Sequence, residues 1–439
     1  MSVPVGITLH LMPRFRSQVW RRPTGLRRFA AVGLALSCAT ACALHAQSTA
    51  SLPPVHQLGA RIAMSRDSLG RLAGIRELSD GRVIVNDVGK RRLLMYDSTL
   101  TRATVVVDST STGARKAYGP RGGGIIPYRG DTTIFVDPTA ISFLVIDPRG
   151  TIARILAPPS DPAAVQTFPP GSLAFDARGR LIYLAPPARL LSQKVAVDSN
   201  PATLVRLDSA ILARADMTTR LVDTAGFIVI GANPQGREVA ARGGAPAYIL
   251  QMYDPIILFD WWAVTTDGSV AMVRGLDYHI DWINADGSRS STPRMAHDWK
   301  RLTDSAKVAI IDSGKHITDS VQRVRNYTDS VARARTYDQS PPPEKVVMQF
   351  VDPSDLPDYM PPFVPGGVVA DADNNVWIRE GASYAMNPPA VYDIVNRQGT
   401  VIDRVQLPPG LLIGGFGHGA VFLTSNEGWG TVIVKYRIR

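Results

Sequence analysis

The residues with the strongest claim to chemistry are polar side chains placed where the second strand of a predicted hairpin ends. Asp87 follows the run RVIVN, Arg274 follows SVAMV, and Arg379 and Glu380 follow NNVWI. If the hairpins repeat around one axis, these strand ends converge on one face and form a ring that binds a polar ligand. Polar turn residues without a ligand are the competing interpretation. The predicted ligand-binding ring consists of Asp87, Arg274, Asp277, Arg379, Glu380 and Trp429.

A second polar group lies in the segment DYHID at 277–281. Alternation along a strand places Asp277, His279 and Asp281 on the same face. One histidine beside two acids is too few nitrogen ligands for a typical zinc site, so we interpret His279 as a hydrogen-bonded structural residue. The other histidines beyond residue 46 show no ligand spacing; they are His56, His297, His316 and His418.

Motifs of known chemistry add no site. The chain contains no Gly-x-Ser-x-Gly elbow, no His-Glu-x-x-His and no P-loop. The segment GFGHGA at 415–420 fits a loose dinucleotide pattern, but a predicted strand follows it where a helix is required, so we predict a hairpin. The segment DADNN at 371–375 lacks the glycine and the closing glutamate of a calcium loop, which predicts a turn. Motifs therefore predict no catalytic residue, no metal ligand and no cofactor.

The elements that must position these residues follow one repeated pattern, which is clearest at 74–100. Short strands at 83–85 and 92–96 are separated by turns rich in Asp, Asn and Gly, and an outer strand follows at 103–107. About six such units follow each other. Repeated four-stranded units of this kind predict an all-β fold, a six-bladed β-propeller over residues 55–439. A β-sandwich is the alternative.

The two ends of the chain are predicted to close the ring. The sixth unit supplies three strands before the sequence stops at Arg439. A lone strand at 55–64 has no hairpin partner of its own. We predict that it pairs with the last unit, because this pairing removes the exposed sheet edges of an open array.

The largest interruption, residues 295–338, lies between the fourth and fifth units and changes to a helical period. Ile317, Val321, Val324 and Val331 fall on one helical stripe, and Gly314 is predicted to separate two helices. One interpretation is a helical arm that packs on the propeller. The other is a lid, or a docking arm for another molecule.

The long segments of the chain are predicted to gather on one side of the propeller, the loop-elaborated face. Short Asp/Gly turns join the first strand to the second and the third to the fourth, so they lie on the opposite face. Because loops carry function more often than strands do, we expect the binding site on the loop-elaborated face. Its long segments are 108–130, 157–170, 185–202, 223–255, 295–345 and 380–390.

The first 46 residues have the layout of a secretory signal. They contain six arginines and no acid, and they end in the apolar, small-residue run 29–46. An uncleaved membrane anchor is the alternative. We predict a signal peptide at 1–46, a linker at 47–54, and a periplasmic or extracellular protein without a membrane span after cleavage.

Charge and cysteine content exclude further classes of function. The net charge is +10, and removal of the six arginines leaves about +4, so nucleic-acid binding loses its main support. Cys38 and Cys42 both lie in the predicted signal, so the rest of the chain has no thiol nucleophile, disulfide or cysteine metal site. We expect a monomer without a nucleic-acid partner.

The runs SDGRVIVND at 79–87, TDGSVAMV at 266–273 and DADNNVWI at 371–378 resemble the blades of NHL-type six-bladed propellers and of the wider regucalcin/gluconolactonase-like superfamily. The resemblance covers most of the chain beyond the signal and implies ligand or protein binding on a propeller face. Lactonases of this group hold a divalent metal with residues in Glu-Gly-Pro and Pro-Asn-Gly motifs. Neither motif occurs here, so no metal ligand is carried over.

Two functions follow from these observations. The first is an exported, non-catalytic propeller without a cofactor, which binds a protein, peptide or glycan on its loop-elaborated face. The alternative is a metal-dependent hydrolase or lactonase with an atypical site in the central channel. The two hypotheses differ in whether the purified protein contains a divalent metal and turns over lactones.

Overall fold

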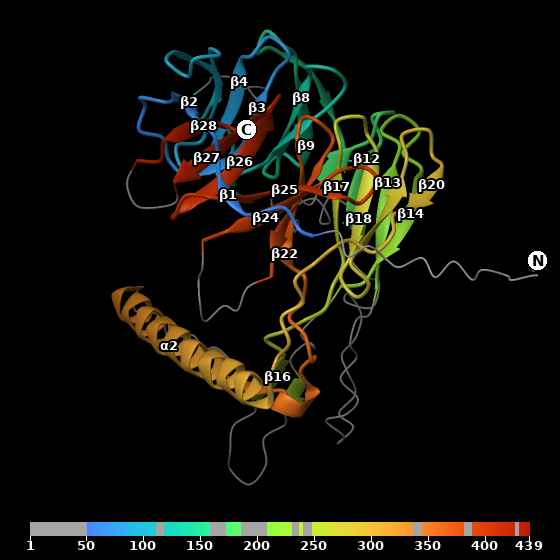
Figure 1. Cartoon of the computed structure of the whole chain (residues 1–439). Helices are drawn as coiled ribbons and strands as arrows, with labels where there is room; N and C mark the ends of the chain where they lie inside the picture. Colours follow the sequence, from blue (N-terminus) through green and yellow to red (C-terminus); the bar gives the residue numbers. More distant parts are fainter. Residues whose placement is uncertain are drawn as a thin grey trace, which may run out of the picture. The chain divides into compact units, whose positions relative to one another are not determined.

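The computed structural model describes residues 51–110, 118–158, 173–185, 209–230, 237–239, 248–336, 345–381, 389–425 and 430–439. Within these residues, the chain forms six blades of a β-propeller, one smaller sheet and one long helix (Figure 1). The predicted fold, an all-β six-bladed propeller with a helical insertion, is therefore confirmed.

Blades one to three come from the first half of the chain. Blade one comprises β3 (Leu72–Glu77), β4 (Val83–Asp87), β5 (Arg92–Tyr96) and β6 (Ala103–Asp108). Blade two comprises β7 (Ile125–Pro127), β8 (Thr133–Asp137), β9 (Ser142–Ile146) and β10 (Ile152–Leu156). Blade three comprises β11 (Leu173–Phe175), β12 (Leu181–Ala185), β13 (Ala210–Ala215) and β14 (Val222–Ile228). From its apolar pattern, the run ATLVRLD at 202–208 is predicted as the third strand of this unit, and it lies outside the described residues.

Blades four to six come from the second half. Blade four comprises β17 (Trp261–Val264), β18 (Val270–Arg274), β19 (His279–Ile283) and β20 (Arg289–Ser291). Blade five comprises β22 (Phe363–Ala370), β23 (Val376–Glu380), β24 (Val391–Val395) and β25 (Val401–Gln406). Blade six comprises β26 (Leu411–Gly417), β27 (Ala420–Ser425) and β28 (Ile433–Arg437), completed by an N-terminal strand.

The turns within the blades repeat one local arrangement, which explains why the pattern is visible in the sequence. Asp147 accepts hydrogen bonds from the backbone N–H groups of Arg149 (3.0 Å) and Thr151 (2.8 Å), and Asp176 accepts equivalent bonds two and four residues ahead. Gly150 then takes a φ of 82°, a left-handed conformation that glycine adopts without steric cost. An aspartate and a glycine three residues later are thus enough to reverse the chain.

Apolar clusters join each blade to the next and close the ring. Six clusters each contain buried residues of two neighbouring blades. In the first half of the ring, Leu93 packs with Phe135 between blades one and two, Val136 with Leu181 between two and three, and Leu212 with Met272 between three and four. In the second half, Val273 packs with Ile378 between blades four and five, Ile394 with Val421 between five and six, and Val85 with Phe422 between one and six. The core is therefore a set of interfaces between blades.

The N-terminal strands close the propeller, as predicted. β2 (Arg61–Met64) pairs antiparallel with β28, and the blue strand lies beside the red one in Figure 1. The expected single strand at 55–64 is divided, however. β1 (His56–Gln57) pairs parallel with β25 and adds a fifth strand to blade five. The break falls at Gly59, whose N–H donates to the carbonyl of Arg437 (3.0 Å).

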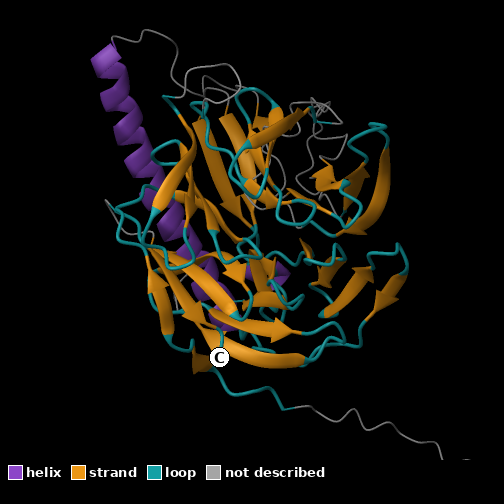
Figure 2. Ribbon diagram, turned by 90° about the horizontal axis from the view of Figure 1, so that it is seen from above, coloured by secondary structure: helices purple, strands orange, loops and turns teal. Residues whose placement is uncertain are grey.

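The insertion between blades four and five is one continuous helix, α2 (Asp304–Thr336), which lies below the blades in Figure 1 and extends outward behind them in Figure 2. The predicted break at Gly314 is wrong. A Cβ atom at this position would lie 2.7 Å from the ring of Phe350, so the glycine permits close packing of the helix.

A small sheet beside the helix has no counterpart in the sequence predictions. It contains β15 (Arg237–Val239), β16 (Tyr248–Tyr253) and β21 (Lys345–Phe350), and β16 pairs parallel with β21. A short 3-10 helix (Pro353–Asp355) then leads back to blade five. The segment that precedes blade four and the segment that follows α2 are thus paired in one sheet.

No helix within the described ranges is both long and apolar enough to cross a membrane.

Candidate active site

A small polar pocket of about 70 Å³ lies where blade five meets the segment that follows blade four. Its polar lining residues are His297, Asp298, Lys300, Glu380 and Arg404. Glu380 ends β23, the second strand of its blade, so the pocket lies on the loop-elaborated face. Several strands and one loop must therefore be in place before these five side chains meet.

Blade five holds three of the charged groups in register. Arg404 on β25 lies directly opposite Asp393 on the neighbouring strand β24. Its Nε donates to Oδ1 of Asp393 (3.0 Å), and its Nη2 donates to Glu380. Asp393 is only 1% exposed. The guanidinium is thus fixed between two acids, one buried and one on the pocket wall.

This arrangement displaces the pKa values of Asp393 and Arg404. Burial raises the pKa of Asp393 to about 6, and the nearby charge of Glu380 adds to the shift. Burial alone would lower the pKa of Arg404, but its bonds to Glu380 and Asp393 outweigh burial and raise it. Asp393 consequently exchanges its proton near neutral pH, as catalytic and proton-storing carboxyls do.

Tyr278 supports the same acid from blade four. Its hydroxyl donates to Oδ2 of Asp393 (3.3 Å), and its side chain is fully buried, which raises the pKa of the phenol well above its usual value. Its φ of 47° is left-handed, which is uncommon for a residue with a large side chain. The turn between β18 and β19 is therefore held in a costly conformation that delivers this hydroxyl to blade five.

His297 lies between two aromatic rings at the pocket wall. Its ring centroid is 5.0 Å from that of Tyr278 and 5.0 Å from that of Trp299. Nδ1 is buried and has no hydrogen-bond partner within the described residues. Burial lowers the pKa of His297, because a protonated ring would place an N–H at Nδ1 without an acceptor. The imidazole is thus neutral at neutral pH and able to accept a proton.

Lys300 is positioned by a short ladder between the loop after blade four and the approach to blade five. Leu302 N–H donates to the carbonyl of Asp358 (2.8 Å), and Met360 N–H donates to the carbonyl of Lys300 (3.0 Å). Arg301 and Tyr359 form the bridge between these bonds. Backbone pairing therefore fixes where the Lys300 side chain leaves the main chain.

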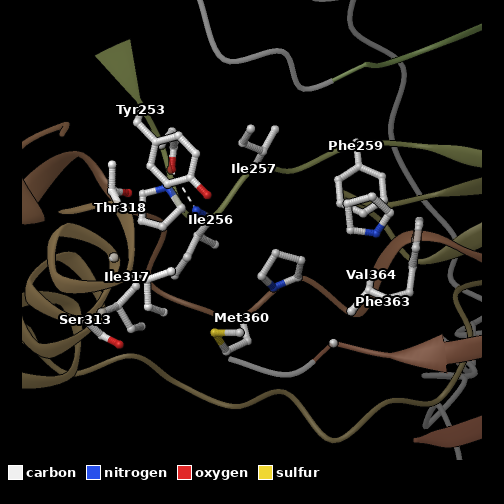
Figure 3. Close-up of a pocket in the computed structure, with 17 residues that line it drawn as sticks. Tyr253, Ile256, Ile257, Phe259, Ser313, Ile317, Thr318, Met360, Phe363 and Val364 are labelled. Atoms are coloured by element: carbon white, nitrogen blue, oxygen red, sulfur yellow. Dashed lines mark hydrogen bonds between the residues drawn. The ribbon is translucent and has the colours of Figure 1, made fainter. Parts of the chain in front are cut away.

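A larger, mostly apolar pocket of about 380 Å³ adjoins the polar one. Both pockets have Met360, Pro361 and Gly381 in their walls. Figure 3 shows side chains of α2, among them Ile317, facing Ile256 across this space. The site as a whole thus offers polar groups on one side of the shared wall and apolar groups on the other.

Among the members of the predicted ligand-binding ring that the structure describes, only Glu380 lines one of these two pockets. Asp87 is fully buried in blade one and binds its own turn, where it accepts from the N–H groups of Gly70 and Lys90 (both 3.0 Å) and from Nε of Arg92 (3.0 Å). Arg379 is half-buried next to Glu380 on β23. Trp429 lies outside the described residues.

The structure brings Arg274 and Asp277 into one charged cluster of blade four. Arg274 pairs with Asp260 and Asp281 (both 2.7 Å), and His279 lies 3.3 Å from Asp281 and 4.0 Å from Asp277. The expected common face of Asp277, His279 and Asp281 is therefore observed. Ligand binding by Arg274 and Asp277 stays a prediction.

The hairpin predicted at the dinucleotide-like segment 415–420 and the turn predicted at the calcium-loop-like segment 371–375 are both confirmed. Residues 415–420 span the hairpin between β26 and β27. Asp371 accepts from the N–H groups of Asp373 (2.9 Å) and Asn375 (2.8 Å) and from the indole of Trp377 (3.0 Å), so its carboxylate is engaged by its own turn.

Sequence reasoning missed most of the pocket. His297 was considered for ligand spacing alone, and Lys300, Asp393 and Arg404 were not singled out. One signal was present: Asp393 and Arg404 are opposite charges inside two adjacent apolar strands, where an isolated charge is costly. A charged pair at cross-strand positions in a predicted blade therefore points to a buried functional cluster.

The divalent metal of the lactonase resemblance finds no matching ligands. Among the described residues, no group of three or more His, Cys, Asp or Glu side chains is arranged to hold a metal ion. Glu380 on the pocket wall and Asp393 behind it are bridged by the guanidinium of Arg404, which balances their charge. No step of the chemistry below is therefore assigned to a metal.

The structure is similar to several solved structures. A gluconolactonase from Xanthomonas campestris is 9% identical, with 88% of this chain and 97% of that chain covered and a TM-score of 0.33. The calcium-binding regucalcin from Agrobacterium tumefaciens is 9% identical, with 88% and 98% covered and a TM-score of 0.34. Virginiamycin B lyase from Staphylococcus aureus is 8% identical, with 87% and 99% covered and a TM-score of 0.35. No family model and no curated protein matches the sequence.

These comparisons correct the first of the two functions. The expected non-catalytic binding propeller is contradicted, because the similar structures include gluconolactonases and regucalcin, and the enzymatic alternative is the better supported one. At such identities the likeness concerns the fold alone, and it transfers no reaction or residue to this chain. The function must be argued from the pocket itself.

Proposed function

We propose that this protein is a hydrolase that cleaves a carboxylic ester or a lactone in the polar pocket next to blade five. The observation that carries the proposal is the convergence of His297, whose pKa is lowered by burial, with Lys300, Glu380 and Arg404 on one pocket. Behind them lies Asp393 with its pKa of about 6. Titratable groups with displaced pKa values that converge on a cleft are candidates for acid–base catalysis.

Hydrolysis at this site requires one water molecule and one proton acceptor. In the proposed step, neutral His297 takes a proton from water while the water oxygen bonds to the carbonyl carbon and the carbonyl π electrons move to its oxygen. The tetrahedral intermediate then collapses, the bond to the alcohol oxygen breaks, and this oxygen takes the proton from the imidazolium. The products are a carboxylic acid and an alcohol, which stay in one molecule when the substrate is a lactone.

The negative oxygen of the intermediate needs fixed positive charge. Lys300 and Arg404 are the cations of the pocket wall, and stabilisation of this kind is often the largest contribution to catalysis. Arg404 is preorganised, because Glu380 and Asp393 both hold its guanidinium. Asp393 therefore acts as a positioning residue for Arg404.

The test follows turnover of p-nitrophenyl esters and aliphatic lactones by the purified protein. His297→Ala is expected to lower kcat at least about 100-fold, because general-base catalysis contributes about 10²- to 10⁴-fold. Activity of the unaltered protein should rise with pH with a midpoint below pH 6.5, since the pKa of His297 is lowered.

His279→Ala is the matched control, because His279 belongs to blade four but does not line the pocket. Its kcat should stay within about twofold of the unaltered protein, a change of less than about 0.5 kcal/mol in the barrier. Full turnover by the His297→Ala variant, or no turnover of any ester or lactone, would contradict the proposed hydrolase.

The metal requirement is measured in the same assay. The proposed role of His297 predicts that turnover persists after treatment with EDTA. If chelation abolished turnover and a divalent metal restored it, water activation would belong to the metal and the role given to His297 would be wrong.

We also propose that the chain is exported to the periplasm or beyond the cell. The arginine-rich start and apolar run of residues 1–46 support this proposal, with 47–54 as the linker that remains. Expression of the full sequence in a Gram-negative host, followed by fractionation and N-terminal sequencing, tests it. A cytoplasmic protein with an intact N-terminus would contradict export.

A further inference from the structure

We propose that the larger, apolar pocket binds an unbranched acyl chain, so that the substrate is a fatty-acyl ester or a lactone with an alkyl tail. The inference rests on the proposed hydrolase for the polar end of the ligand. The binding of the chain itself rests on the apolar pocket alone.

The pocket walls are predominantly aliphatic and come from separate segments. Ile256 and Ile257 come from the stretch between β16 and β17, Ile310 and Ile317 from α2, and Val364 from the start of β22. Its volume of about 380 Å³ falls in the range of small-molecule sites. Aliphatic surfaces of this kind suit a hydrocarbon chain, which gains affinity in proportion to the area removed from water.

The first half of α2 is fixed, so the pocket is preformed. Lys307 is buried and its Nζ donates to the carbonyl of Leu356 (2.9 Å) and to Oδ1 of Asp358 (2.8 Å). Ile311 packs in a cluster with Leu302 and Val351. The helix therefore does not need to move before the pocket can be filled.

The pocket adjoins the polar site at one tight point. Gly381 lies in both walls, and a Cβ atom there would lie 2.0 Å from the carbonyl oxygen of Pro361. Only glycine permits this contact between the end of β23 and the approach to β22. An amphiphile with its carbonyl near Lys300 and Arg404 thus has an apolar space beside its tail.

The opposite end of the pocket opens where α2 leaves the body. Ile317 lines the pocket but is 46% exposed, and Val321, one turn further, is 61% exposed and does not line it. The chain is therefore expected to extend toward Ile317. The apolar stripe predicted from the sequence changes role along its length, from pocket wall to free helix surface.

The test compares binding of sodium dodecanoate and sodium butanoate by isothermal titration calorimetry. Each buried methylene contributes roughly fourfold in affinity, so dodecanoate should bind at least about 100-fold more tightly than butanoate. Ile317→Asp should weaken dodecanoate at least about tenfold, because it places a charge in the pocket wall. Val321→Asp, the matched control on the same helix, should leave the affinity within about twofold.

Equal affinities for the two acids, or equal losses in the two aspartate variants, would overturn the acyl-chain proposal. The His297→Ala variant separates this proposal from the proposed hydrolase: dodecanoate should bind it as tightly as the unaltered protein. Retained turnover in that variant with selective dodecanoate binding would refute the catalytic assignment and leave the pocket assignment in place.

Discussion

Asp393 shows how one buried carboxyl relates stability to function at the scale of a single residue. The fold holds it among Arg404, Tyr278 and the charge of Glu380, and burial raises its pKa from 3.8 to about 6. The folded state therefore retains this proton at pH values where the unfolded chain has lost it. By linkage, this residue lowers the free energy of unfolding as pH rises from about 4 to about 6.

Asp393→Asn is expected to remove this penalty. The free energy of unfolding of the variant, minus that of the unaltered protein, should increase by about 1–3 kcal/mol between pH 4 and pH 7. Urea unfolding at both pH values measures the difference. A difference independent of pH would show that Asp393 does not titrate in this range.

Asp403→Asn is the control of opposite sign. Burial alone would raise the pKa of Asp403, but hydrogen bonds from Arg439 and His56 outweigh it and lower the pKa. Ionised Asp403 therefore stabilises the fold above the pKa of the unfolded chain, and this stability is lost as pH falls. The Asp403→Asn variant should be less stable than the unaltered protein at pH 7, and this difference in the free energy of unfolding should be smaller at pH 4.

At the scale of elements, α2 combines an anchored half with an exposed half. Lys307 holds the first turns to residues 356–358, whereas Val321 and Val324 of the second half are 61% and 66% exposed. Few buried contacts support the second half, so its amides are expected to open more readily. Rigid pocket wall and mobile extension thus belong to one helix.

Lys307→Ala should release the anchored half. The buried carbonyl of Leu356 loses its donor, and we expect a loss of about 1–3 kcal/mol in the free energy of unfolding. Hydrogen exchange should become faster in 304–317 and 353–360. Lys315→Ala, which removes an exposed lysine 3.5 Å from Asp312, should change stability by less than about 0.5 kcal/mol. Equal effects of the two substitutions would contradict the anchoring role.

The blades were predictable because their information is local. An aspartate and a glycine three residues apart reverse the chain at Asp147 and Gly150, and the apolar strands follow. The sheet of β16 and β21 was not predictable, because these parallel strands are separated by blade four and the helical insertion, and no turn joins them. Gly314 was wrongly predicted to break the helix, because the packing against Phe350 that explains this glycine involves a residue distant in sequence.

The candidate site was predictable only in part for the same reason. Glu380 was found because it ends a predicted strand. His297 acquires its displaced pKa from burial beside Tyr278 and Trp299, and Arg404 acquires its place from Asp393 on the neighbouring strand. Burial and cross-strand neighbours belong to the folded chain, so no local spacing announces them.

At the scale of the whole molecule, the ring depends on pairing between its two ends. β2 completes blade six, and Ser65 accepts a hydrogen bond from the N–H of Ile433 (2.9 Å) at a buried position. Without β2, the edge of β28 would be exposed to other chains. Closure therefore protects the molecule as well as stabilising it.

A chain that begins at Arg66 lacks both N-terminal strands. Compared with a chain that begins at Ser51, we expect a loss of about 3–5 kcal/mol in the free energy of unfolding, from about four lost backbone bonds and the packing of β2. Size-exclusion chromatography should also show oligomers, formed through the open edge. Equal unfolding midpoints and an unchanged elution volume would contradict the role of closure.

The seam between β2 and β28 also has a kinetic consequence. Each blade is made of hairpins between near neighbours, whereas the contact of Ser65 with Ile433 spans 368 residues. Local hairpins form fast, and contacts of such long range form late in folding. We therefore expect the seam to assemble last, and we expect the rate at which one short N-terminal strand detaches to influence the lifetime of the closed ring.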